Sequence, residues 1–227
     1  MITKNRGKED KLFLDTADKD EIVKLSNFDW IKGVTTNPTL IRYVHKKRQS
    51  LIDEIEQEFD DKKLFVQVQG RSYKEMEEDF FYLLEVTSKT TGLKVPTTEN
   101  GLELIQKIKN EHPERTVLAT IVYSVEQGYL AGLVGCDWIA PYVNRMENQN
   151  INPYKIVQDI HQLYHVQNLS TKIMGASFKN QAQIRQTLLS GADTVTVPPI
   201  IIKSMMNNVL AEESLKVFQQ HAQEEEI

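Results

Sequence analysis

The chain has 227 residues, of which 40% are hydrophobic and 26% are charged, and its formal net charge is -5 at pH 7. This length and balance indicate a globular protein with a sizeable core, and they exclude a disordered, fibrous or low-complexity chain. The acidic balance argues against a nucleic-acid partner, because nucleic-acid binding usually needs a basic face, but a local cationic pocket for an acidic small molecule stays open.

Short β-type runs recur along the chain, and polar segments separate them. In chain order the runs lie at 12–14, 33–35, 64–68, 93–95, 117–120, 138–143, 172–177 and 194–197. Two of the segments between them, 72–87 and 100–109, carry apolar residues at spacings of three and four, which is typical of an amphipathic helix. Many of the β-type runs are apolar throughout, as in a parallel sheet that helices cover.

This alternation of strand and helix predicts an α/β fold. Eight units favour a closed (β/α)8 barrel, or TIM barrel, over an open doubly wound sheet, whose glycine-rich fingerprint is missing after the first strand. No Pro/Gly/Ser-rich linker interrupts the chain. We therefore expect one domain over residues 1–227, with 1–10 as an N-terminal extension and 211–227 as an additional C-terminal helix with an acidic tail, packed on the barrel or on a neighbouring subunit.

Cysteine usage and the ends of the chain bear on the compartment. The single cysteine, Cys136, excludes an intramolecular disulfide, and its apolar surroundings indicate a buried structural thiol. Residues 1–10 are charged and lack the apolar core of a signal peptide, and no apolar run approaches the roughly 18–20 residues of a membrane span. We therefore expect a cytoplasmic protein with no membrane partner.

Polar residues stand at the carboxyl ends of the predicted strands, where the active sites of such barrels gather. They are Asp15, Thr36, Asn37, Gln67, Lys94, Thr120, Tyr142, Asn144, Arg145, Ser177 and Lys179. Because they come from different strands of one barrel, we expect them to meet at a single mouth.

Two of these residues have competing interpretations. Lys94 lies inside a short apolar strand, where a charged amine is unfavourable, and burial would lower its pKa and make it a nucleophile for a carbonyl carbon. It could equally be a strand-end lysine that reaches solvent. Asp15 could cap the following helix, or it could transfer a proton and orient substrate hydroxyls.

An anion pocket is indicated by Arg145 together with Ser177 and Lys179, because phosphate sites in these barrels often use the loops after strands seven and eight. Metal chemistry is not indicated. His161 and His165 have a chelating spacing but lack the glutamate of the His-Glu-x-x-His motif, which favours surface packing. The sequence also lacks the nucleophile elbow of serine hydrolases and the phosphate loop of NTPases.

The strand-end segments together resemble the transaldolase family, and within it the small subfamily that includes fructose-6-phosphate aldolase. The matching stretches, in order, are 13–17, 33–38, 93–96, 122–128, 140–145 and 176–179. Their order and spacing fit the family pattern from about residue 11 to about residue 210, so the resemblance covers most of the chain.

The resemblance implies a (β/α)8 barrel that works by a class I mechanism with no metal and no organic cofactor. Lys94 matches the Schiff-base lysine, which attacks the C2 carbonyl of a ketose so that the C3–C4 bond can break. Asp15 matches the aspartate that handles substrate hydroxyls and proton transfer. Thr36 and Asn37 match the motif at the dihydroxyacetone end, and the anion pocket described above matches the site of the terminal phosphate.

Further positions in the resemblance concern the enamine, the intermediate that remains on the lysine after the C3–C4 bond breaks. Gln67 and Thr120 match positions that hold a water used for proton transfer. Gln67, Tyr142 and Ala140 stand where typical transaldolases carry glutamate, phenylalanine and often serine, and they look like the aldolase branch. A tyrosine hydroxyl near the water would help to protonate the enamine and release dihydroxyacetone.

The resemblance thus implies cleavage of fructose 6-phosphate to dihydroxyacetone and glyceraldehyde 3-phosphate. One alternative is transfer of the dihydroxyacetone unit from fructose 6-phosphate, or from 6-deoxy-6-sulfofructose, to an aldehyde acceptor. Another, from a different class, is an inactive barrel that binds sugar phosphates. The resemblance also implies a homo-oligomer, a ring of five subunits that is often paired into ten.

Overall fold

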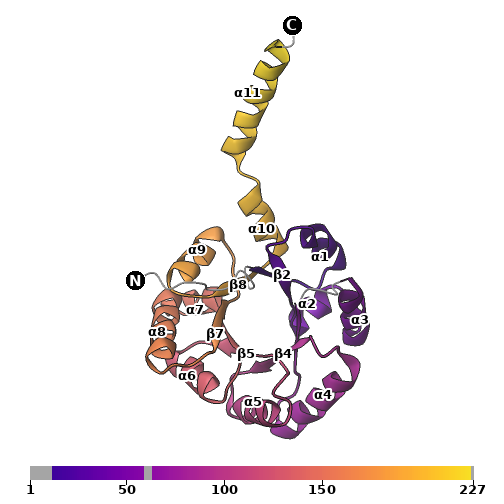
Figure 1. The fold of residues 1–227 in the computed structure, drawn as a ribbon, viewed down its shortest axis with the longest axis vertical. Helices are drawn as coiled ribbons and strands as arrows, with labels where there is room; N and C mark the ends of the chain where they lie inside the picture. Colours follow the sequence, from indigo (N-terminus) through magenta and orange to yellow (C-terminus); the bar gives the residue numbers. More distant parts are fainter. Residues whose placement is uncertain (1–11, 59–62, 226–227) are drawn as a thin grey trace.

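The structure is a computed structural model that describes residues 12–58 and 63–225. The eight strands form a closed parallel barrel in which each strand pairs with the next and β8 pairs with β1 (Figure 1). The strands are β1 (Leu12–Asp15), β2 (Ile31–Thr35), β3 (Lys63–Gln67), β4 (Gly92–Pro96), β5 (Val117–Val122), β6 (Trp138–Pro141), β7 (Lys172–Gly175) and β8 (Thr194–Val197). The predicted (β/α)8 barrel is confirmed, whereas the predicted extension 1–10 lies outside the described residues.

Helices follow the strands and cover the outside of the barrel (Figure 1). They are α1 (Lys19–Ser26), α2 (Pro38–Tyr43), α3 (Arg48–Glu58), α4 (Tyr73–Val86), α5 (Glu99–Glu111), α6 (Val125–Leu133), α7 (Val143–Glu147), α8 (Pro153–Val166), α9 (Gln181–Leu189), α10 (Pro199–Met206) and α11 (Val209–Glu225). Helices α4 and α5 match the two amphipathic segments that the sequence predicts.

Local sequence explains where a typical helix of this layer begins and which face it buries. Ser72 and Glu75 form a capping box at the start of α4, in which each side chain bonds the backbone N–H of the other. The apolar stripe of Met76, Phe80 and Leu83 is buried against the barrel, as the spacing of three and four predicts.

Two strands end two residues earlier than the sequence predicts. The chain turns into α7 directly after Tyr142, so β6 ends at Pro141 and β7 ends at Gly175. An isolated bridge between Tyr142 and Ala176 extends the pairing of these strands by one residue. The early turn places Tyr142, α7 and the loop that follows Gly175 at the mouth of the barrel.

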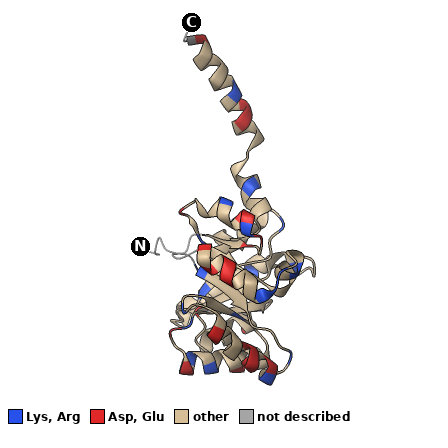
Figure 2. Cartoon of the chain, turned by 90° about the vertical axis from the view of Figure 1, so that its right-hand side faces the viewer, with Lys and Arg blue, Asp and Glu red and all other residues tan. Residues whose placement is uncertain are grey.

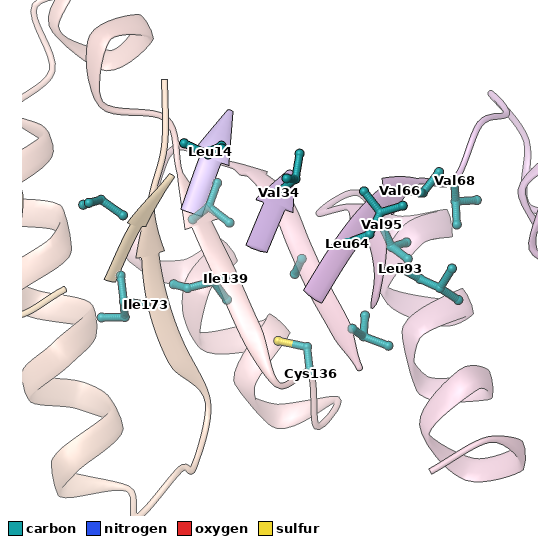
Figure 3. Close-up of a cluster of buried hydrophobic side chains, with 14 of the residues drawn as sticks. Leu14, Val34, Leu64, Val66, Val68, Leu93, Val95, Cys136, Ile139 and Ile173 are labelled. Carbon is teal, nitrogen blue, oxygen red and sulfur yellow. The ribbon is translucent and has the colours of Figure 1, made fainter. Parts of the chain in front are cut away.

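The outer core lies between the strands and the helices. Leu14, Val34, Val66 and Val95 point outward from neighbouring strands into this layer, and Cys136 lies in the same layer below them (Figure 3). Burial raises the pKa of the Cys136 thiol to about 12, so the thiol stays protonated. The sequence-based interpretation of a buried structural thiol is confirmed.

The inner core fills the barrel itself. The Phe13 ring lies 5.8 Å from that of Phe65 and 6.4 Å from that of Trp138, centroid to centroid, in edge-to-face contacts. Glycines make room for these rings, since a Cβ on Gly33 would lie 2.8 Å from Phe13 and one on Gly92 would lie 2.4 Å from Phe65. Successive side chains alternate between the faces of a strand, so Asp15, two residues after Phe13, also points inward and nearer the mouth.

Helix α11 leaves the barrel and projects away from it at the end of the chain (Figure 1). Its large apolar side chains are exposed, and they include Leu215 at 54% and Phe218 at 66% of full exposure. Charged residues of both signs are spread over the barrel helices, while much of α11 is uncharged (Figure 2). Among the described residues, no helix is long and apolar enough to cross a membrane.

Candidate active site

A cavity of about 540 Å³ opens at the carboxyl ends of the strands. It brings together most of the residues that the sequence analysis selects. Those that line it are Asp15, Asn37, Gln67, Lys94, Ala140, Tyr142, Arg145, Ser177 and Lys179. Thr36 and Thr120 are buried behind this lining, where they contact residues that face the cavity.

Lys94 lies at the centre of β4 and points into the barrel, because its neighbours Leu93 and Val95 point outward into the outer core. Its side chain is buried, with a relative exposure of 3%, and Nζ donates a hydrogen bond of 2.8 Å to the carbonyl oxygen of Thr36. Burial lowers the pKa of the Lys94 amine, and the nearby charge of Asp15 opposes this shift. The alternative of a strand-end lysine in solvent is wrong.

Asp15 faces Lys94 across the cavity from the end of β1. It does not cap the following helix, because the N-cap of α1 is Asp18, whose carboxylate accepts from the backbone N–H groups of Asp20 and Glu21. Burial raises the pKa of Asp15, while the charge of Lys94 and a hydrogen bond from Thr35 lower it. The protonation state of the Asp15 carboxyl therefore depends on its immediate neighbours.

Thr36 and Asn37, which directly follow β2, support the site in two ways. The hydroxyl of Thr36 donates to the carbonyl of Phe65 at 3.1 Å, so Thr36 contacts Lys94 through its backbone oxygen and does not line the cavity. The amide oxygen of Asn37 caps α2 by accepting from Leu40 N–H at 3.0 Å. That cap fixes the Asn37 side chain at the cavity wall and leaves its NH₂ group to donate to a ligand.

On the opposite wall, the hydroxyl oxygens of Tyr142 and Thr120 lie 2.9 Å apart in a hydrogen bond. Burial is the largest cause that raises the pKa of Tyr142, so the phenol keeps its proton near neutral pH. Ala140, two residues earlier in the chain, has no side chain beyond a methyl group and also lines the cavity. The wall therefore offers a neutral hydroxyl donor in the same cavity as the Lys94 amine.

Gln67 reaches the cavity from the end of β3, and an ion pair outside the barrel holds the backbone there. The Arg48 guanidinium pairs with both carboxylate oxygens of Asp79 and also donates to the Gln67 carbonyl at 3.5 Å. Asp79 accepts from Gln69 N–H at 2.7 Å. The loop after β3 is thus fixed by one largely buried pair of opposite charges.

Cationic and hydroxyl groups gather on one side of the mouth. The guanidinium of Arg145 donates to the Tyr123 hydroxyl at 3.4 Å and lies over the Tyr142 ring, 5.2 Å from its centroid. Ser177 and Lys179 line the same cavity from the loop after β7. Arg145 and Lys179 are exposed, so an anion at this end of the cavity would remain close to solvent.

A buried side chain connects the two loops of this cationic end. The amide of Gln183 donates to the side chain of Asn144 at 3.1 Å and accepts from Lys179 N–H at 2.7 Å. Asn144 N–H in turn donates to the Ser177 carbonyl at 2.8 Å. Ser177 has a φ of 62°, in the left-handed region, so these contacts hold a backbone conformation that serine rarely adopts.

The structure also places residues at the site that the strand-end pattern does not include. Thr196 and Ile121 line the cavity, and Thr35 bonds Asp15 directly. Threonine and isoleucine are ordinary strand residues, so their presence in a strand carries little functional signal. The alternation of Thr194 and Thr196 is a signal that puts both on one face, but the left-handed φ of 57° at Ile121 has no sequence signature.

The candidate metal residues stay apart from the cavity. Within residues 12–58 and 63–225, no three His, Cys, Asp or Glu side chains gather in a group that could hold a metal ion. His161 instead packs against Gly191, where a Cβ would lie 2.6 Å from the imidazole ring.

Fold and site together define the class. The structure is a (β/α)8 barrel with a buried amine, a carboxyl group and a tyrosine hydroxyl converging at the mouth where the enzymes of this fold place their active sites. A family model described as Transaldolase/Fructose-6-phosphate aldolase matches residues 12–227. The chain therefore belongs to the transaldolase/fructose-6-phosphate aldolase family, and it is an enzyme of the aldolase or transaldolase type.

Curated relatives agree with the family. A probable transaldolase from Chelativorans sp. (strain BNC1) is 31% identical over 208 residues, which cover 92% of this chain and 94% of that protein. A probable transaldolase from Ruegeria sp. (strain TM1040) is also 31% identical, over 210 residues that cover 92% of this chain and 94% of that protein.

Proposed function

We propose that the chain is a class I aldolase or transaldolase in which Lys94 forms a Schiff base with a ketose that carries a terminal anion, most suitably fructose 6-phosphate. The burial of the Lys94 amine inside the barrel carries this proposal. Because burial favours the uncharged amine, Lys94 has a free electron pair for attack on a carbonyl carbon.

The reaction uses the groups around Lys94 in turn. Nζ attacks C2 of the ketose, and loss of water gives an iminium. Asp15 accepts the proton of the C4 hydroxyl as the C3–C4 bond breaks, and the electron pair of that bond moves into the iminium to form an enamine. The aldehyde leaves, and the dihydroxyacetone unit stays on Lys94.

The end of the reaction separates the two activities. In an aldolase, a proton is added to C3 of the enamine, and water then hydrolyses the iminium to release dihydroxyacetone and free Lys94. In a transaldolase, the enamine attacks an acceptor aldehyde instead. The neutral Tyr142 hydroxyl, bonded to Thr120 beside the cavity, favours protonation through a water that Gln67 and Thr120 hold.

The cationic end of the cavity supports a ketose with a terminal anion. Arg145 and Lys179 supply positive charge, and Ser177 supplies a hydroxyl donor. Both prolines at the start of α10, Pro198 and Pro199, lack a backbone N–H, so that helix offers fewer donors to an anion than a helix start normally would. A phosphate or a sulfonate of the same ketose would suit these groups.

Trapping with borohydride tests the Schiff base. Incubation with fructose 6-phosphate and sodium borohydride should add a reduced adduct to the intact mass, and peptide mapping should find it on Lys94. Lys94→Met should abolish the adduct, whereas Lys172→Met, at the opposite end of the barrel, should keep it. An unchanged mass for the wild-type chain would contradict the mechanism and would favour an inactive sugar-phosphate-binding barrel.

Release of dihydroxyacetone distinguishes the two activities. An aldolase should release free dihydroxyacetone from fructose 6-phosphate without an added aldehyde. Turnover that requires an aldose phosphate acceptor would instead identify a transaldolase, and 6-deoxy-6-sulfofructose would then be the next donor to assay.

A further inference from the structure

Two threonine hydroxyls connect the cavity to Asp15. The hydroxyl of Thr35 donates to Oδ1 of Asp15 at 3.1 Å. The hydroxyl oxygen of Thr35 lies 2.7 Å from that of Thr196, on β8. Both threonines are buried, with relative exposures of 0% and 2%, but only Thr196 lines the cavity. The chain of contacts thus runs from the cavity through Thr196 and Thr35 to the carboxyl group.

The direction of the hydrogen bonds in this chain is fixed by the charge on Asp15. A threonine hydroxyl has one proton to donate, and a charged carboxylate can only accept. While Asp15 is charged, the Thr35 proton is committed to Asp15, so the short contact between the threonines requires Thr196 to donate to Thr35. When Asp15 holds a proton on Oδ1, it can donate to Thr35, Thr35 can donate to Thr196, and the Thr196 proton becomes available to the cavity.

We propose that Thr196 is a positioning residue for Asp15: its hydroxyl orients the Thr35 proton onto the charged carboxylate, and it turns its own proton to the cavity after Asp15 has accepted one. The hydroxyls rotate, and no proton passes along the chain. The proposal rests on the proposed role of Asp15 in the cleavage, in which the C4 hydroxyl loses its proton and becomes a carbonyl that can only accept hydrogen bonds. Thr196 presents a donor to the cavity at that stage.

Other charged and titratable groups also act on Asp15 and must be separated from the threonines. Lys94, on β4, and Lys179, after β7, both lower the Asp15 pKa through their charge, and Tyr142, directly after β6, is close enough to interact with it. Thr196 has no charge, and replacing it leaves these groups in place. A change caused by Thr196 therefore reports on the hydroxyl chain.

The first experiment follows the proton affinity of Asp15 without substrate. The aspartate carboxyl carbons are labelled with ¹³C, the Asp15 signal is assigned with Asp15→Asn, and its chemical shift is followed against pH. Thr196→Val, which has nearly the same shape but no hydroxyl, should raise the proton affinity of Asp15 roughly three- to tenfold, as expected for a weakened hydrogen bond to a charged group. Thr196→Ser should titrate like the wild type.

The second experiment measures turnover of fructose 6-phosphate. Thr196→Val should lower kcat roughly tenfold with little change in KM, and it should move the acidic limb of the kcat profile to higher pH. Thr196→Ser should restore both. Thr171→Val is the matched control, because Thr171 is a buried threonine that donates to the Cys136 carbonyl away from the cavity.

The outcomes separate the positioning role of Thr196 from the proposed function. The positioning role is overturned if Thr196→Val titrates and turns over like the wild type. It is also overturned if Thr196→Ser behaves like Thr196→Val, since the methyl group and not the hydroxyl would then matter. If Thr196→Val does not fold, Thr196→Ala removes the same hydroxyl and takes its place. If borohydride traps nothing on Lys94 in the wild type, the proposed function fails. The Asp15 titration still decides whether the Thr196 hydroxyl positions the Thr35 proton on Asp15.

Discussion

Lys94 and Asp15 occupy one cavity, and burial shifts their two pKa values in opposite directions. Burial lowers the pKa of the amine and raises that of the carboxyl, so each shift reduces the charge on its group. Each residue's charge opposes the shift of the other. A substitution at either residue therefore changes the protonation of its partner, and loss of activity in an Asp15 variant includes an effect on Lys94.

Whether the dihydroxyacetone unit is released or transferred is expected to depend on the Tyr142 hydroxyl. Tyr142→Phe keeps the ring under Arg145 but removes the hydroxyl that bonds Thr120. We expect slower protonation of the enamine, and hence less free dihydroxyacetone relative to product formed with an added aldose phosphate. The ratio of the two products, measured in one assay, checks this.

Tyr123→Phe is a suitable control, because Tyr123 also contacts Arg145 through its hydroxyl but does not bond Thr120. An equal change of the ratio in both variants would assign the effect to Arg145 and not to enamine protonation.

At the level of elements, the Arg48–Asp79 pair joins the start of α3 to the middle of α4 and holds the loop that follows β3. Both side chains are largely buried, with 14% and 16% exposure, so the pair is less screened by solvent than a surface ion pair. Asp79→Asn keeps the shape but removes the charge that two donors share. We expect it to lower the free energy of unfolding by about 1–3 kcal/mol.

Denaturant unfolding measures this loss, and Asp53→Asn provides the comparison. Asp53 is exposed on α3 and accepts from the Gln49 amide on its own helix. Its substitution should stay within about 0.5 kcal/mol of the wild type. Equal stability losses in the two variants would contradict a special role for the Asp79 pair.

The elements were largely predictable, because strand and helix periodicities agree with the final packing. The ends of β6 and β7 were not, because the apolar residues after Pro141 and Gly175 look like strand residues although they belong to α7 and to a loop. Most of the residues that line the cavity were predictable, because they are polar residues at the ends of strands. Thr196 was not predicted, because its proposed role rests on a contact with Thr35, 161 residues earlier, that no local pattern indicates.

At the level of the whole molecule, α11 is the element without a packing partner among the described residues of its own chain. Ala211, Leu215, Phe218 and Ala222 recur at spacings of three and four, which forms one apolar stripe along the helix. A helix of this length is marginal in water unless its apolar face is covered. We propose that a neighbouring copy covers it in a homo-oligomer of five or ten subunits.

Phe218→Glu should weaken this assembly, because it places a charge in the apolar stripe. We expect a lower molar mass by light scattering at micromolar concentration. Gln219→Glu adds the same charge at the next position, outside the stripe, and should keep the wild-type mass. A wild-type chain that is monomeric over the same concentrations would contradict the assembly.

The aromatic filling of the barrel has a kinetic consequence. Among the described residues, Phe13, Phe65 and Trp138 fill the interior beneath the cavity, so we expect a molecule that enters through the mouth to leave by the same opening. In the proposed mechanism, the aldehyde made by cleavage would then occupy the space that an acceptor aldehyde needs. Transfer would therefore follow a double-displacement sequence, with parallel lines in reciprocal plots of rate against donor concentration at different acceptor concentrations.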